Sequence, residues 1–195
     1  TTPKTQKKRT MKILLASNSP RRKELLTSLN IEFETVKVDC DEIYPEDLEI
    51  EKIAEYLSEL KSNAYQNLAE NEILITADTI VAIGNEILGK PKDENEAKEM
   101  LRKLSGNTHQ VLTGITLRST KKNISVTDIA QVETDILTEK EINDYINRYK
   151  PFDKAGSYGV QEWFGMAKIK KINGSFYTIM GLPTHLVYAL LKDFQ

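Results

Sequence analysis

Apolar residues along the chain follow two periods, and their alternation predicts an α/β fold. Short apolar or alternating runs predict strands, whereas longer segments with one apolar face predict helices. The expected strands are Lys12–Ala16, Phe33–Val38, Ile73–Ala77, Thr79–Ile83, His109–Arg118, Ile124–Asp135, Met166–Ile172 and Phe176–Met180. The expected helices are 19–29, 48–68, 93–104, 138–148 and 183–194, with a turn at Gly84-Asn85 and a glycine-rich loop at Lys150–Gly165. Strands that alternate with helices are typical of a sheet covered by helices.

Three of these helices carry capping signals of their own. Ser19 is followed by Pro20, the residue pair that favours a helix start. Asp93 opens the next such helix and Gly106 follows its end, while residues 138–141 form a capping box.

Length and composition indicate a globular protein without an overall charge preference. The 195 residues are 39% hydrophobic and 29% charged. They suffice for one α/β domain of two closely joined lobes, expected over residues 12–195. Residues 1–11 are expected to form a disordered leader, since they are polar and basic and lack the apolar segment of a secretory signal. A net charge of -2 favours neither nucleic acid nor an anionic membrane as a partner.

The cellular compartment is predicted from two further features. No apolar run approaches the roughly 20 residues that span a bilayer. The single cysteine, Cys40, excludes an intramolecular disulfide and fits a reducing compartment. A cytoplasmic location is therefore expected.

The first candidate site follows the first expected strand, at Ser17-Asn18-Ser19-Pro20-Arg21-Arg22. Backbone N–H groups and the positive end of a helix converge there, which favours an anion. Arg21 and Arg22 lie at the helix end that disfavours cations, unless an anion such as phosphate compensates them. The alternative is an ordinary capped helix with exposed arginines.

Acidic residues give two more candidates. Asp39, Asp41 and Glu42 could hold Mg²⁺ or Mn²⁺, although a solvated acidic loop is the favoured explanation of this cluster taken alone. Asp78 interrupts an apolar run, where a carboxylate is costly unless it is paired, bound to metal or facing a cleft. It is thus a candidate general base or metal ligand, and otherwise a turn aspartate between two short strands.

Two lysines and a glutamine complete the candidates. Lys61 falls inside the apolar stripe of its helix, so it either snorkels outward or points into a cleft. Lys90 projects from the tight Gly89-Lys90-Pro91 loop, as a phosphate ligand or a surface lysine. Gln161 ends a glycine-rich loop and offers a donor and an acceptor to a base edge, or simply belongs to a structured loop. His109, His185 and Cys40 show no catalytic spacing.

Taken in order, these segments resemble the Maf family of nucleotide pyrophosphatases over about residues 12–190. The motifs that carry the resemblance are Ala16–Arg22, Asp41-Glu42, Lys61, Ala77-Asp78-Thr79, Gly89-Lys90-Pro91, Leu104-Ser105-Gly106, Asp153–Gln161 and Gly181-Leu182-Pro183. The resemblance implies a mixed α/β, Maf/ITPase-like fold with an elongated twisted sheet, flanking helices and a central cleft. It also implies a cytoplasmic homodimer.

The resemblance further implies hydrolysis of a nucleoside triphosphate to the monophosphate and diphosphate with a divalent cation, Mg²⁺ or Mn²⁺. Tyr158-Gly159-Val160-Gln161 is similar to the branch that acts on dTTP and UTP. The implied roles are general base for Asp78, metal binding for Glu42 and Asp78, and base selection for Arg21, Thr79 and Gln161. The implied substrate-binding residues are Ser17, Arg21, Arg22, Lys61, Thr79, Lys90 and Gln161. The sequence departs from the family where Glu162, Trp163 and Phe164 follow the glutamine.

Two other classes of function compete with this interpretation. A nucleotide-binding regulator of cell division, acting in septum formation, could use the same anion pocket without turnover. A monophosphate phosphatase or kinase-like phosphotransferase is the other class, and the lack of a G-x-x-x-x-G-K-[ST] loop counts against a P-loop enzyme.

Overall fold

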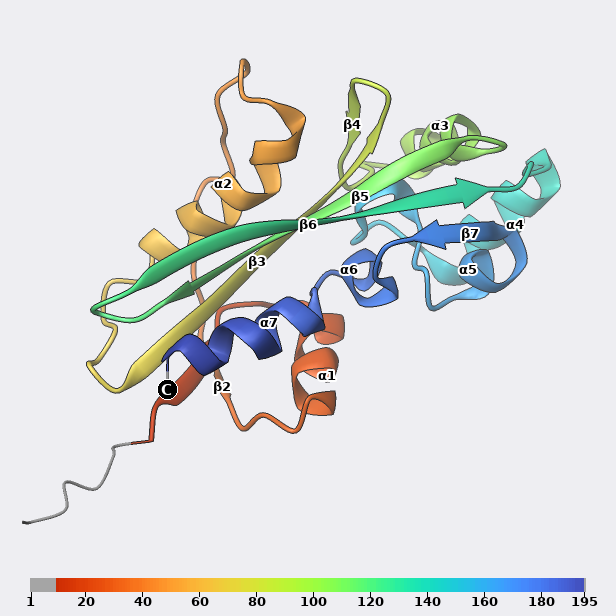
Figure 1. The fold of residues 1–195 in the computed structure, drawn as a ribbon. Coiled ribbons are helices and arrows are strands. Elements are labelled where there is room, and N and C mark those ends of the chain that lie inside the picture. The colour runs from red at the N-terminus through yellow and green to blue at the C-terminus, as the bar shows by residue number, and fades with distance from the viewer. Residues whose placement is uncertain (1–9, 195) are drawn as a thin grey trace, which may run out of the picture.

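The computed structural model describes residues 10–194 and is built around a seven-stranded mixed sheet (Figure 1). The strand order is β2-β1-β3-β5-β6-β7, and β4 pairs with β3. The strands are β1 (Lys12–Leu15), β2 (Glu34–Thr35), β3 (Glu72–Ile83), β4 (Glu86–Leu88), β5 (Thr108–Arg118), β6 (Asn123–Thr134) and β7 (Ile169–Asn173). β1 runs parallel to β2 and β3, whereas the other pairs are antiparallel. The prediction of a mixed α/β fold is confirmed.

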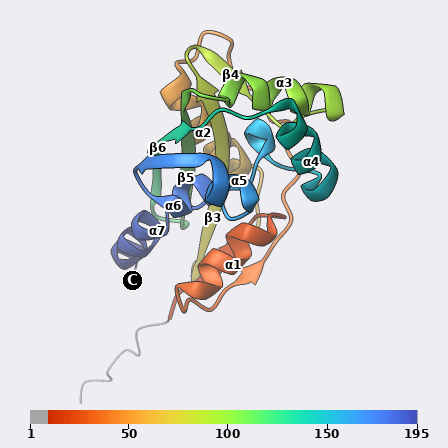
Figure 2. The same cartoon turned by 90° about the vertical axis from the view of Figure 1, so that its right-hand side faces the viewer.

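Helices cover both faces of this sheet. They are α1 (Pro20–Ser28), α2 (Ile50–Asn63), α3 (Glu94–Leu104), α4 (Glu139–Tyr149), α5 (Trp163–Lys168), α6 (Phe176–Met180) and α7 (Thr184–Leu191), with 3₁₀ turns η1 (Ala155–Ser157) and η2 (Lys192–Phe194). α1 and α7 lie at one end of the long strands, and α3 and α4 lie at the other (Figures 1 and 2). Among the described residues, no helix is long and apolar enough to cross a membrane.

Strand alternation decides which helix each side chain of the sheet meets. On β5, Leu112 packs with Ile53 and Leu57 of α2. The neighbouring odd-numbered residues, such as Ile115, pack with Leu26 of α1 and its surroundings on the other face. Because successive side chains of a strand point to opposite faces, adjacent residues of β3 also pack against different helices.

A close approach seats α2 on the sheet. A Cβ atom on Gly114 of β5 would lie 2.3 Å from the carbonyl carbon of Ala54, so only glycine fits beneath the helix. The buried Ser58 hydroxyl lies 2.7 Å from the Thr116 hydroxyl, and the Thr76 hydroxyl donates to the Ser58 carbonyl at 2.6 Å. These contacts fix α2 both along and across the strands.

The end of α2 differs from the sequence prediction. The helix stops at Asn63 rather than at Leu68. The Arg118 guanidinium donates to the Ser62 carbonyl at 2.7 Å and to the Tyr65 carbonyl at 2.6 Å. A side chain from β5 therefore satisfies the helix-end carbonyls and allows the chain to turn away.

The structure departs from the predicted strands at four places. The second strand is only Glu34–Thr35, and β3 runs unbroken through Asp78, which pairs with Gly114 of β5. Residues 176–180 form helix α6 instead of a strand. The Ser175 hydroxyl accepts from Tyr177 N–H at its start, and Gly181 follows its end with a φ of 116°. Residues 163–168, expected as loop and strand, form α5.

The capping predictions are confirmed. The Ser19 hydroxyl accepts from Arg22 N–H, and Asp93 accepts from Glu96 N–H. The capping box at Thr138 is complete. Residues 1–9 of the expected leader lie outside the described residues, and Met11 packs partly buried against the cluster around Leu15.

Candidate active site

The candidate site opens at an interruption in one edge of the sheet. β1 pairs with β3 as far as Ile75, and β4 pairs with it from Val81 onward. Between them, no described strand pairs with residues 76–80 on this edge, although β5 continues along the other. A cleft of about 660 Å³ lies here. Because Asp78 faces α2 and Thr79 faces α1, the open edge exposes both faces of β3 to one cavity.

The start of α1 forms one wall of this cleft. The Ser17 hydroxyl accepts from Ser19 N–H at 3.2 Å, and the Ser19 hydroxyl accepts from Arg22 N–H at 3.4 Å. Two N–H groups of the predicted anion site are thus satisfied within the helix start itself. The side chains of Arg21 and Arg22 also line the cleft on this wall.

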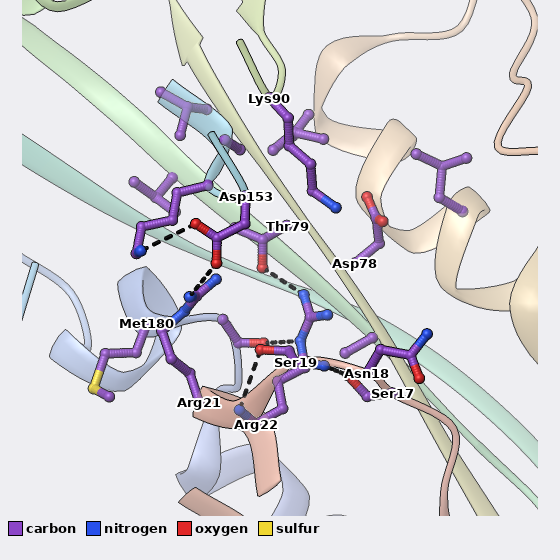
Figure 3. Close-up of a pocket in the computed structure, with 18 of the residues that line it drawn as sticks. Ser17, Asn18, Ser19, Arg21, Arg22, Asp78, Thr79, Lys90, Asp153 and Met180 are labelled. Carbon is purple, nitrogen blue, oxygen red and sulfur yellow. Dashed lines mark hydrogen bonds and ion pairs between the residues drawn. The ribbon is translucent and has the colours of Figure 1, made fainter. Parts of the chain in front are cut away.

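Arg22 is held firmly from two sides. Its Nε donates to the Gly181 carbonyl at 2.7 Å, and its Nη2 donates to the Thr79 hydroxyl at 3.1 Å (Figure 3). The Thr79 hydroxyl lies 2.8 Å from the Thr113 hydroxyl, which donates to the Thr178 carbonyl. Burial lowers the pKa of Arg22, yet an arginine stays charged at neutral pH. The structure therefore fixes a cation beside Thr79.

Arg21 has a looser partner. Its Nη1 lies 3.4 Å from Asp153 Oδ2, and Asp153 also pairs with Lys154 at 3.2 Å. The Asp153 carboxylate is largely exposed, so this ion pair contributes little stability. Arg21 and Arg22 therefore both have protein partners in the first turn of α1.

Asp78 and Lys61 form the second wall. Lys61 Nζ lies 2.7 Å from Asp78 Oδ1 and 3.3 Å from Glu42 Oε1, and it donates to the Ala77 carbonyl at 3.1 Å. Lys61 therefore points into the cleft, and the snorkelling alternative is wrong. Asp78 is only 8% exposed, and this burial raises the pKa of its carboxyl although Lys61 and Arg22 lower it.

Lys90 enters from the side opposite α1 (Figure 3). Lys90 points toward the space between Asp78 and Thr79, facing the arginines of α1 (Figure 3). Gly156 N–H donates to the Gly89 carbonyl at 3.1 Å, which joins the Lys90 loop to the glycine-rich loop. Gln161 also lines the cleft.

The structure brings into one cavity the nine residues to which the family resemblance gives a role in the site. Its described lining includes Ser17, Arg21, Arg22, Glu42, Lys61, Asp78, Thr79, Lys90 and Gln161. Asp39 and Asp41 are absent from that lining. Five cationic side chains against three carboxylates give the cleft a local positive charge, although the chain carries a net charge of -2. Such a cavity suits a polyanion.

Sequence reasoning missed Thr113, which supports Thr79 from the neighbouring strand. Its only signal was a hydroxyl in the apolar run Val111–Leu117. Asp153 and Lys154 belonged to a quoted motif but received no role in the site.

Comparison with known proteins identifies the family. The model of the Maf-like protein family matches residues 12–194. A dTTP/UTP pyrophosphatase of Bacteroides thetaiotaomicron is 50% identical over 182 residues, covering 92% of this chain and 94% of the relative. Proteins of the same name from Porphyromonas gingivalis and Flavobacterium psychrophilum are 49% and 45% identical, covering 94% and 93% of this chain and 94% of each relative. The chain therefore belongs to the Maf family.

Proposed function

We propose that this protein hydrolyses dTTP and UTP to the nucleoside monophosphate and diphosphate. The observation that carries the proposal is the buried Asp78 carboxylate beside Lys61, in a cleft with cations on opposite walls. The names of the relatives support the same activity and the same substrates.

In this proposal the cationic side chains hold the triphosphate. Arg21 and Arg22 contact it from α1, while Lys61 and Lys90 contact it from the other walls. Guanidinium and ammonium groups offset phosphate charge and stabilise the charge that develops on the departing diphosphate. Ser17 completes the grip at the start of α1.

Asp78 accepts a proton from the water that attacks the α phosphorus. Burial raises the pKa of Asp78, which makes it a better proton acceptor than an exposed aspartate. Lys61 opposes that rise, because its positive charge favours the ionised carboxylate. The oxygen of water forms a bond to the α phosphorus, and the bond from that phosphorus to the bridging oxygen breaks.

A divalent cation, Mg²⁺ or Mn²⁺, fits this site as a partner of the substrate. Glu42 and Asp78 offer two carboxylates around Lys61 Nζ. No group of three or more His, Cys, Asp or Glu side chains that could hold a metal occurs within residues 10–194. Mg²⁺ commonly binds one or two carboxylates together with substrate phosphates and water. When bound, the cation would neutralise phosphate charge.

Base selection is assigned to Gln161, Thr79 and Arg21, which all line the cleft. The amide of Gln161 can donate and accept, as the edge of uracil or thymine requires. A panel of dTTP, UTP, CTP and GTP at equal concentration tests this assignment. A preference for GTP would show that the pyrimidine assignment is wrong.

The decisive variant is Asp78→Asn, which keeps the size of the side chain and removes its charge. Loss of a general base should lower diphosphate release about 10²–10⁴-fold. Asp128→Asn is the control, because Asp128 accepts from the Thr178 hydroxyl outside the cleft lining. An Asp78→Asn protein with the parent rate would contradict the proposed role.

The competing regulator of cell division would bind the same nucleotides without turnover. Purified protein with Mg²⁺ or Mn²⁺ separates the two, because only the enzyme releases diphosphate. Release of orthophosphate would instead favour a phosphatase. A homodimer and a cytoplasmic location remain parts of the proposal, and sedimentation of the purified chain tests the first.

A further inference from the structure

A tight turn presents Gln161 to the cleft. Glu162 N–H donates to the Gly159 carbonyl at 3.1 Å, so Val160 and Gln161 are the two central residues of the turn. Val160 is 4% exposed and belongs to the same buried cluster as Phe164, whereas Gln161 is exposed in the cleft. The position of the Gln161 amide thus depends on Gly159 and Glu162, the first and last residues of this turn.

The hydroxyl of Tyr145 binds both of these end residues. The Tyr145 hydroxyl accepts from Gly159 N–H at 3.0 Å and donates to Glu162 Oε1 at 2.8 Å. Burial raises the pKa of Tyr145, so its hydroxyl stays protonated and able to donate. The ring is itself fixed, because it stacks on Tyr149 with 5.0 Å between centroids and contacts Phe164.

The side chain of Glu162 accepts this hydrogen bond from Tyr145 and does not cap the helix that follows. It occupies the N-cap position of α5 but makes no side-chain capping hydrogen bond there. Its carboxylate instead fills the space beside Gly159, where a Cβ would lie 2.3 Å from Oε1. Lys154 lies 3.9 Å from the same oxygen, and both side chains are largely buried. Glu162, where the sequence departs from the family pattern, therefore makes specific contacts that hold the loop.

We propose that Tyr145 and Glu162 are positioning residues that set nucleobase preference by holding the turn that carries Gln161. This inference rests on the proposed function, because it takes Gln161 as the residue that contacts the base. Neither Tyr145 nor Glu162 lines the cleft, so any effect on the base passes through loop residues that do, among them Gln161. Their loss should change the ratio of activities on two bases more than it changes stability.

The test compares UTP with CTP, which differ only at the base edge. Tyr145→Phe removes the hydroxyl and keeps the stacked ring, so the UTP/CTP ratio of kcat/KM should fall about tenfold. Tyr149→Phe is the matched control, because no hydrogen bond of its hydroxyl is found among the residues that the structure describes. It should leave the ratio unchanged.

Two further sets of variants separate positioning from general loosening. Glu162→Gln retains an oxygen that can accept from Tyr145 and should keep most of the preference, whereas Glu162→Ala should lose it. In a Gln161→Ala background, Tyr145→Phe should lower the ratio no further. An equal fall in both backgrounds, or a Tyr145→Phe ratio equal to that of the Tyr149→Phe control, would overturn the inference.

The proposed activity and this inference fail in different ways. If the parent releases no diphosphate, the proposed function is wrong, and the same variants are compared by the ratio of their Kd values for UTP and CTP in calorimetry. A ratio that Tyr145→Phe leaves unchanged overturns the positioning role in either assay. A parent with no preference between UTP and CTP overturns it as well.

Discussion

Replacing Gly114 with alanine is expected to lift α2 away from the sheet. The added Cβ would lie 2.3 Å from the Ala54 carbonyl carbon and 2.4 Å from Glu55 N, whereas ordinary contacts begin at 3.4 Å. Both neighbours are backbone atoms, so no side-chain rotation can relieve the overlap. The helix and β5 must therefore separate by about 1 Å, the amount that restores an ordinary contact.

That separation should reduce both stability and activity. Overpacking a close contact costs about 1–3 kcal/mol, and an overlap between backbones belongs at the upper end. The 2.7 Å hydrogen bond between Ser58 and Thr116 crosses the same contact and would stretch. Lys61 lies one turn further along α2, so its 2.7 Å contact with Asp78 would shift too. A catalytic group displaced by about 1 Å can lower the rate about 10²-fold.

Urea unfolding and UTP hydrolysis measure these two effects separately. Gly84→Ala is the control: its Cβ would meet nothing within 4 Å, but its φ of +56° disfavours alanine. That change should cost about 1 kcal/mol of stability and leave kcat/KM unchanged. If Gly114→Ala unfolds at the parent urea concentration and retains the parent kcat/KM, then α2 is not seated as described.

Three more outcomes are expected. Thr113→Val should raise KM about fivefold without a matching fall in kcat. The substitution removes the hydrogen bond between Thr113 and Thr79, the residue that holds Arg22, and such a bond is worth about 1 kcal/mol. An unchanged KM would show that Thr113 does not support Arg22 through Thr79. Lys61→Met should move the acidic limb of the kcat/KM profile to higher pH, because Lys61 lowers the pKa of Asp78 against the effect of burial; an unshifted limb would refute this coupling. Burial lowers the pKa of His109 from 6.5 to about 4. As the pH falls from 6.5 to about 4, His109 therefore takes up a proton in the unfolded chain before it does so in the folded one. The free energy of unfolding should fall by about 3 kcal/mol over this range. Unfolding curves of His109→Gln should lack this pH dependence.

Helix starts with a recognisable capping signature could be predicted from the sequence. Asp93 and the Thr138 capping box act within one turn of their own helices, and both caps are present as expected. Helix α6 was missed because Phe176–Met180 is a short apolar run that fits either period. Its bounds depend on local capping by Ser175 and on the positive φ of Gly181, which an apolar pattern does not reveal.

The candidate site divides in the same way. Charged residues in costly positions, such as Arg22 and Asp78, were recognisable because the cost itself is visible in a sequence. Thr113 was not, since its role depends on a hydroxyl 34 residues away in the chain. The contact between Tyr145 and Glu162 likewise needs α4 folded against the loop: Glu162 was noticed only as a departure from the family pattern, and nothing in the sequence pointed to Tyr145.

The open edge of β3 explains how one cleft can combine two separate kinds of side chain. In a continuous sheet, Asp78 and Thr79 would face different layers and could not meet one ligand. Pairing with β1 ends at Ile75 and pairing with β4 begins at Val81, so a molecule in the gap reaches both faces. In the proposed mechanism, Lys61 and Asp78 on one face and Arg22 and Thr79 on the other then act on the same triphosphate. The points at which β1 ends and β4 begins thereby set the length of β3 that is open to a ligand, although neither strand supplies a proposed catalytic residue.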